Sequence, residues 1–61
     1  MNYQEKIRFL LKQHNCTIYA LSAKLDIAKS TLNALEKGIS KDIRSARNRR
    51  VIDNEVLRLQ K

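Results

Sequence analysis

The sequence predicts a small all-α domain, and three observations lead to that expectation. The 61 residues include one glycine and no proline, so almost nothing interrupts a helix. Leucine, alanine, lysine, arginine and glutamate, which are good helix formers, are abundant. Apolar residues recur at spacings of three and four along most of the chain, as on one face of a helix. At this length, residues 1–61 are expected to form a single domain.

The first helix is expected over residues 2–14. Its core-facing stripe, at helical spacing, comprises Tyr3, Ile7, Leu10, Leu11 and His14. Phe9 lies roughly opposite this stripe, and three interpretations stay open: packing on the C-terminal segment, a contact between two copies, or simple exposure. His14 stands at the helix end, where a cation complements the helix dipole, and we interpret it as structural.

A short second helix is expected over about residues 18–25. Thr17 is a favoured N-cap residue, and Ile18, Leu21 and Leu25 share one helical face. Asp26 then interrupts the pattern. Because aspartate favours turns and tolerates a left-handed backbone, a tight turn is expected there.

A third helix is expected over about residues 29–37. Ile27, Leu32 and Leu35 restore the apolar spacing, and Gly38 follows where a helix C-terminus needs a residue with positive φ. Residues 17–38 are therefore predicted to form a helix, a sharp corner and a second helix whose N-terminal half faces away from the core. This arrangement suits entry into the major groove of DNA.

A fourth helix, capped by Ser40, is expected over about residues 41–60, because no glycine or proline interrupts that segment. Its first part is strongly basic, since five of the residues from 41 to 50 are lysine or arginine. The apolar stripe of Ile52, Val56 and Leu59 has no evident partner in the chain beyond Phe9. We therefore expect this stripe to pair two copies of the protein.

Two acidic residues of the same segment are expected to stabilise the helix. Asp53 and Glu55 lie three or four residues from basic neighbours, with which they are predicted to form ion pairs. These neighbours are Arg49, Arg50 and Arg58.

The charge of the chain points to a polyanionic partner, with 13 lysine and arginine residues against 6 acidic ones and a formal net charge of +7. A single cysteine and a single histidine provide no disulfide and no zinc site, and no catalytic set is evident. We therefore expect no enzyme activity, cofactor, metal or small-molecule ligand. The apolar run at residues 9–11 is far too short to span a bilayer, so a cytoplasmic protein without membrane contact is expected.

The segment from Ile18 to Gly38 resembles the helix-turn-helix of the lambda-repressor-like family of phage and bacterial regulators, also called the Cro/CI or XRE family. The matching positions are Leu21, Ser22, Ile27, Ser30, Thr31, Leu32, Leu35, Glu36 and Gly38. The resemblance covers about a third of the chain, and the first helix fits too. It implies an all-α domain with a helix-turn-helix at residues 17–38 and an extended basic C-terminal helix, which binds DNA and regulates transcription.

Several positions depart from the family pattern. Ile18 replaces a glutamine that often touches the DNA backbone, Asp26 replaces the turn glycine, and Ala28 replaces a serine or threonine that caps the third helix. DNA binding is therefore expected to rely more on lysine and arginine. The family also pairs Glu36 with an arginine of the first helix, but the corresponding place near Leu11 offers none. Glu36 is expected to face Arg44 or water.

The resemblance and helical geometry together place four residues on the outer face of the third helix as base contacts. These are Lys29, Ser30, Asn33 and Ala34, whose side chains suit guanine or adenine edges and thymine methyl groups. Contacts to phosphate are expected from residues that meet the sugar-phosphate backbone. These are Thr31, Lys37, Ser40, Lys41 and Arg44.

The leading hypothesis is a sequence-specific repressor that binds double-stranded DNA as a homodimer, at half-sites about one helical turn, roughly 34 Å, apart. Two other hypotheses stay open. A helix-turn-helix module that binds protein, such as an antirepressor or inhibitor, would show no salt-sensitive DNA binding. A non-specific basic protein that binds nucleic acid would show steep salt dependence without a preferred sequence.

Overall fold

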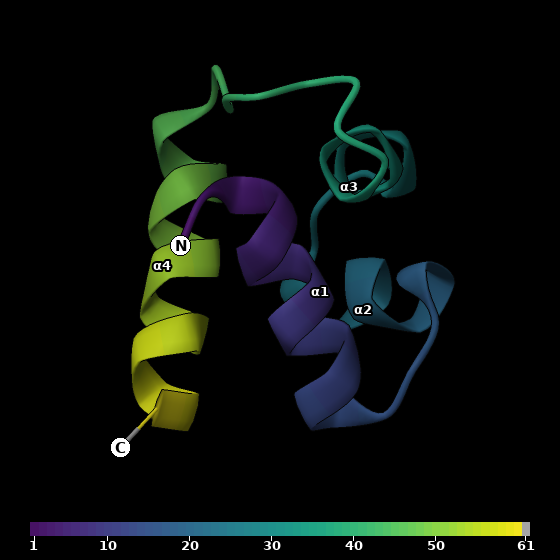
Figure 1. Ribbon diagram of the computed structural model, residues 1–61, viewed down its shortest axis with the longest axis vertical. Coiled ribbons are helices and arrows are strands. Elements are labelled where there is room, and N and C mark those ends of the chain that lie inside the picture. The colour runs from purple at the N-terminus through teal and green to yellow at the C-terminus, as the bar shows by residue number, and fades with distance from the viewer. Residues whose placement is uncertain (61) are drawn as a thin grey trace.

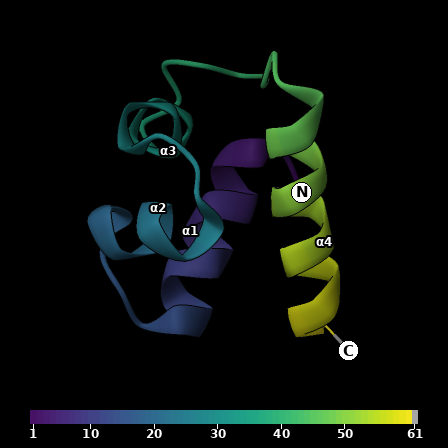
Figure 2. The ribbon, with the colours of Figure 1, turned by 180° about the vertical axis from the view of Figure 1, so that it is seen from behind.

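The computed structural model describes residues 1–60, which form four helices (Figure 1). α1 spans Tyr3–His14, α2 Ile18–Leu25, α3 Lys29–Glu36 and α4 Ala46–Gln60. α1 contacts all three other helices. Figures 1 and 2 show it between α4 on one side and the α2–α3 pair on the other. The prediction of a small all-α domain is confirmed.

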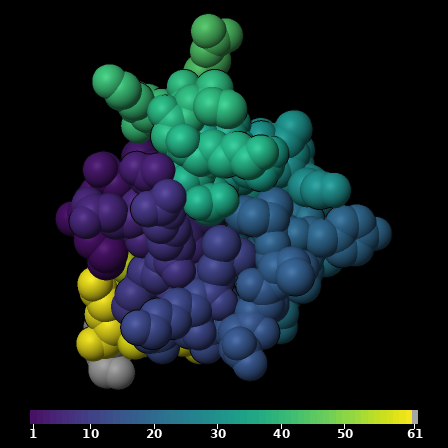
Figure 3. All heavy atoms as spheres, turned by 45° about the vertical axis from the view of Figure 1, so that its right-hand side comes forward, coloured from purple at the N-terminus to yellow at the C-terminus, as the bar shows by residue number. Residues whose placement is uncertain are grey.

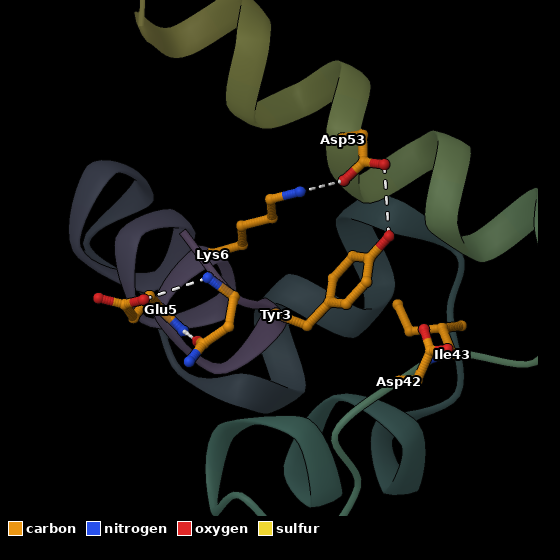
Figure 4. Close-up of polar contacts among 7 residues, drawn as sticks. Tyr3, Glu5, Lys6, Asp42, Ile43 and Asp53 are labelled. Carbon is orange, nitrogen blue, oxygen red and sulfur yellow. Dashed lines mark hydrogen bonds and ion pairs between the residues drawn. The ribbon is translucent and has the colours of Figure 1, made fainter.

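α1 begins at Tyr3 because Asn2 caps it. The Asn2 side chain accepts a hydrogen bond from the Glu5 backbone N–H at 2.8 Å (Figure 4). The Glu5 carboxylate accepts one in return from the Asn2 backbone N–H at 3.1 Å, which completes a capping box. The helix ends at Asn15, which adopts the left-handed conformation with φ 50°.

The two middle helices lie where the sequence predicts them. The Thr17 hydroxyl accepts a hydrogen bond from the Ala20 N–H at 3.2 Å and so caps α2. Asp26, with φ 55°, makes the left-handed turn that ends α2. α3 has no side-chain cap from Ala28 and ends at Glu36, one residue earlier than expected.

Gly38 follows the end of α3 with φ 79°, as the sequence predicts. A Cβ atom at this position would meet Gln4 Nε2 of α1 at 3.2 Å. Glycine is therefore required both by the backbone conformation and by the close approach of α1.

The fourth helix begins later than predicted, at Ala46 rather than near residue 41, and the expectation that Ser40 caps it is wrong. The Ser40 N–H instead donates to the Ala34 carbonyl at 3.2 Å, closing the end of α3. The start of α4 is capped by Ser45, whose hydroxyl accepts from the Asn48 N–H at 3.2 Å.

Burial of Ile43 explains why the connecting loop stays non-helical. The Ile43 side chain is 5% exposed and joins the core from the loop itself. The Asp42 carboxylate accepts a hydrogen bond from the Ile43 N–H at 2.7 Å, a local bond that competes with helix formation. Residues 39–45 therefore cross from α3 to α4 as an irregular segment (Figure 1).

One hydrophobic cluster forms the core of the molecule. Its buried members are Ile7, Leu10, Leu21, Leu25, Ile27, Leu32, Leu35, Ile43, Ile52 and Val56. Every helix contributes two or more of them. Phe9 is half-buried and packs against the same cluster, which rules out simple exposure of this ring.

The expectation that the stripe on α4 pairs two copies of the protein is wrong. Ile52 is 0% exposed and Val56 4% exposed within a single chain, while Leu59 packs against the edge of the core. Fully buried side chains have no surface left for a second copy. The stripe packs against the chain itself because α4 lies along α1.

Polar contacts also fasten α4 to α1 (Figure 4). Asp53 accepts from Lys6 Nζ at 2.7 Å and from the Tyr3 hydroxyl at 3.3 Å. Burial and the nearby charge of Asp53 raise the pKa of Tyr3. The predicted pairing of Asp53 with arginines of its own helix is therefore wrong, because α1 offers closer partners.

The second acidic residue of α4 behaves as predicted. Glu55 pairs with Arg58, three residues away, at 2.7 Å. It also contacts His14 Nε2 at 2.8 Å, which joins the C-terminal ends of α1 and α4. The structural interpretation of His14 is confirmed, with a carboxylate as its partner.

Stability is predicted to fall in acid because of Glu55, whose side chain is 17% exposed. The hydrogen bond from Arg58, aided by His14 and opposed by burial, lowers the pKa of Glu55 from 4.5 to about 2. Its contribution, at most about 3 kcal/mol, is complete above pH 4.5 and is lost as pH falls towards about 2.

Urea unfolding followed across this pH range tests the prediction. The Glu55→Gln protein, which cannot titrate there, is expected to lose less stability than the wild type between about pH 6 and about pH 2. Identical losses in the two proteins would contradict it.

Candidate nucleic-acid interface

The α2–α3 corner presents one face of α3 to solvent. Leu32 and Leu35 point into the core, and Ile27 anchors the corner at 5% exposure. On the opposite side, Lys29 and Ser30 are exposed, while Asn33 and Ala34 are half-buried. The four residues expected to contact bases therefore all retain accessible surface on α3.

A groove of about 480 Å³ lies between α3 and the following loop. Its lining includes two expected base-contact residues and three expected phosphate-contact residues. They are Ser30, Ala34, Thr31, Ser40 and Arg44, with Leu35, Asp42, Ile43, Ser45 and Asn48 completing the wall. Figure 3 shows the loop, coloured green, projecting beyond the rest of the molecule next to α3.

Two exposed lysines belong to the same part of the chain. Lys37 is exposed at the end of α3, and Lys41 is exposed beside a second hollow that Asn2, Gln4 and Gly38 help to line. Every predicted phosphate-contact residue thus lies on α3 or within the loop that follows it.

The cations on this face have no ion-pair partner among the described residues. Among the described residues, the face carries four cationic side chains without an ion pair: Lys29, Lys37, Lys41 and Arg44. Four of the six carboxylates pair with other cations, while the Glu5 and Asp42 carboxylates accept backbone hydrogen bonds. The fixed charges therefore favour an anion at the α3 face.

Glu36 has a partner that sequence reasoning missed. Its carboxylate lies 3.3 Å from Arg8 Nε of α1, so the expectation that it faces Arg44 or water is wrong. Gln4 Nε2 also donates to the Glu36 carbonyl at 3.0 Å. Arg8 precedes Leu11 by one helical turn, and that spacing is the signal that could have revealed the pair.

Arg47 is a second contact that the sequence did not reveal. From the first turn of α4 its guanidinium donates to the Asp26 carbonyl at 2.9 Å and lies 3.3 Å from the Asp26 carboxylate. This bond ties α4 to the corner between α2 and α3. The left-handed Asp26, which replaces the turn glycine, supplies both acceptors.

These features define a class of protein: a four-helix domain whose exposed, basic α3 follows a tight corner, as in DNA-binding helix-turn-helix proteins. The helix-turn-helix family model HTH_3 matches residues 7–50. The chain belongs to this family, which is the XRE and Cro/CI-like group, and is a DNA-binding helix-turn-helix regulator.

Neither a curated protein nor a solved structure matches the chain. Among residues 1–60, no helix has the length and apolar character needed to cross a membrane. The family match includes α1 from Ile7 onwards, α2, α3, the loop and the first turn of α4, and so contains all the residues expected to contact DNA.

Proposed function

We propose that this protein is a sequence-specific repressor that acts in the cytoplasm by placing α3 in the major groove of double-stranded DNA. The observation that carries the proposal is the set of four cations without an ion pair on α3 and its following loop, where Asp42 is the one carboxylate of the loop and Glu36 of α3 is paired with Arg8. Such a face attracts a polyanion and presents side chains that can distinguish bases.

The outer face of α3 supplies the base contacts in this proposal. Asn33 suits adenine because its amide both donates and accepts, and Lys29 suits the two acceptors of guanine. Ser30 donates or accepts, and the Ala34 methyl group suits the methyl group of thymine. Sequence preference comes from these four positions.

Phosphate contacts supply most of the affinity. Thr31 and Ser40 offer hydroxyl groups within the groove, where Arg44 also lies. Lys37, after the last residue of α3, and Lys41, in the loop, offer exposed ammonium groups. Ile18 and Ala28 provide no polar side-chain group, and α3 has no side-chain cap, so cations replace these family contacts.

Binding as a homodimer is part of the proposal, because one recognition helix reads only a few base pairs. Two copies would contact half-sites about 34 Å apart on one side of the duplex. Repression then follows from occlusion of the DNA. Sedimentation tests this: the protein is expected to bind a whole operator as two copies and a single half-site as one copy.

Replacing Asn33 by alanine is expected to change the sequences that the protein selects from random duplexes. Preference for adenine at one position of each half-site should be lost, with affinity for the wild-type operator falling by about 1–3 kcal/mol. The matched control is Asn54→Ala, which removes an exposed asparagine from α4 and should leave the motif unchanged.

Each failure of this selection has a distinct meaning. Enrichment of no sequence, together with steeply salt-dependent binding, would indicate a non-specific nucleic-acid-binding protein. Absence of salt-sensitive DNA binding would favour a module that binds protein. An unchanged motif for the Asn33→Ala protein would remove Asn33 from the reading surface.

A further inference from the structure

The second residue of α2, Tyr19, has no part in the core. Its side chain is 71% exposed although it is large and mostly apolar. It nevertheless has one defined contact, since Lys29 Nζ lies 5.6 Å from the centroid of its ring. That distance is within the range of a cation–π interaction. The contact joins the beginning of α2 to the first residue of α3.

The other lysine–tyrosine contact in the described residues has a different character. Lys6 Nζ lies 4.7 Å from the Tyr3 ring, but Asp53 pairs with Lys6 and accepts from Tyr3 as well. That ammonium is neutralised within the protein. Lys29 has no carboxylate partner, so the ring of Tyr19 orients its charge without neutralising it.

Orientation matters at this position because lysine has a long side chain with four rotatable bonds. A free lysine loses rotamer entropy when it is fixed against a base, and that loss lowers its selectivity. An aromatic ring that already restricts the ammonium reduces this cost on binding.

We propose that Tyr19 is a positioning residue for DNA recognition: its ring holds Lys29 so that the ammonium reads a guanine at the edge of the half-site. Tyr19 thereby sets a base preference through Lys29 without contacting that base. This inference rests on the proposed sequence-specific binding by α3. It adds a residue of α2 to the determinants of specificity.

The test measures base preference rather than affinity alone. Sequences are selected with the wild type and with Lys29→Met, and the position that Lys29→Met alters identifies the base pair read by Lys29. Binding is then measured on matched duplexes that carry guanine or another base there. The Tyr19→Leu protein is expected to lose guanine preference by about two- to fivefold, the range of an exposed cation–π contact.

Two further variants make the result specific. Tyr19→Phe keeps the ring and is expected to keep the guanine preference. The double variant Tyr19→Leu with Lys29→Met should show the same guanine preference as Lys29→Met alone, because both substitutions act through one contact. Since Tyr19 is exposed, thermal unfolding of all these proteins should match the wild type.

Several outcomes would overturn the inference. If Tyr19→Leu keeps the full guanine preference, the ring does not position Lys29. If Tyr19→Leu and Tyr19→Phe both weaken binding to every duplex equally, Tyr19 acts through its hydroxyl on phosphate instead. Both results leave the proposed function standing, whereas failure of the wild type to enrich any sequence would remove that function together with this inference.

Discussion

A chain that ends at Arg50 is expected to be unfolded and therefore unable to bind DNA. It would lack Ile52 and Val56, which are buried in the core, and Asp53 and Glu55, which fasten α4 to α1. Truncating one such isoleucine to alanine costs about 2–5 kcal/mol. A chain of this length is stable by only roughly 3–9 kcal/mol, so losing the whole segment exceeds its stability.

Circular dichroism with a thermal melt tests this expectation. The shortened chain should show little helical signal and no cooperative transition, and Ile52→Ala should melt well below the wild type. The control is Leu57→Ala, a truncation at a side chain that is 56% exposed, which should melt close to the wild type. A cooperative melt of the shortened chain would contradict the assignment of α4 to the core.

The second large effect is expected from the loop after α3. The double variant Lys41→Ala with Arg44→Ala should bind every duplex about 10- to 100-fold more weakly at moderate salt, because it removes two of the proposed phosphate contacts. The base preference should stay the same. The slope of log affinity against log salt should become shallower by about 2.

The single variants Lys41→Ala and Arg44→Ala are measured as well, and the control for each of them is Lys12→Ala. It removes one exposed positive charge near the C-terminal end of α1, at the opposite end of the molecule from the loop (Figure 1). Its salt slope should remain close to that of the wild type. If Lys12→Ala and Arg44→Ala change the slope equally, the DNA responds to net charge rather than to the loop.

The bounds of α2, and those of α3 to within one residue, were predictable because their determinants are local. Thr17, Asp26 and Gly38 each act within a few residues of their own position. The start of α4 was not predictable from local sequence, because Ser40 and Ser45 are both acceptable N-cap residues. Burial of Ile43 among residues from every helix decides between them, and this is a tertiary contact.

The candidate interface was also predictable only in its local features. Helical periodicity identified the outward face of α3, but the pairs Arg8–Glu36 and Arg47–Asp26 join residues 28 and 21 positions apart. No local pattern specifies the Arg47–Asp26 pair, and only the place of Arg8 one helical turn before Leu11 hinted at the other. The α4 stripe was assigned to the wrong partner because an amphipathic face has the same pattern whether it packs on its own chain or on a copy.

The position of α4 has a consequence for how the protein is made. The helix-turn-helix is complete in sequence by Gly38, yet the core that supports it needs side chains from α4. During synthesis, α1, α2 and α3 leave the ribosome before their last packing partner. The newly made protein is therefore expected to fold, and so to bind DNA, only after α4 has been made.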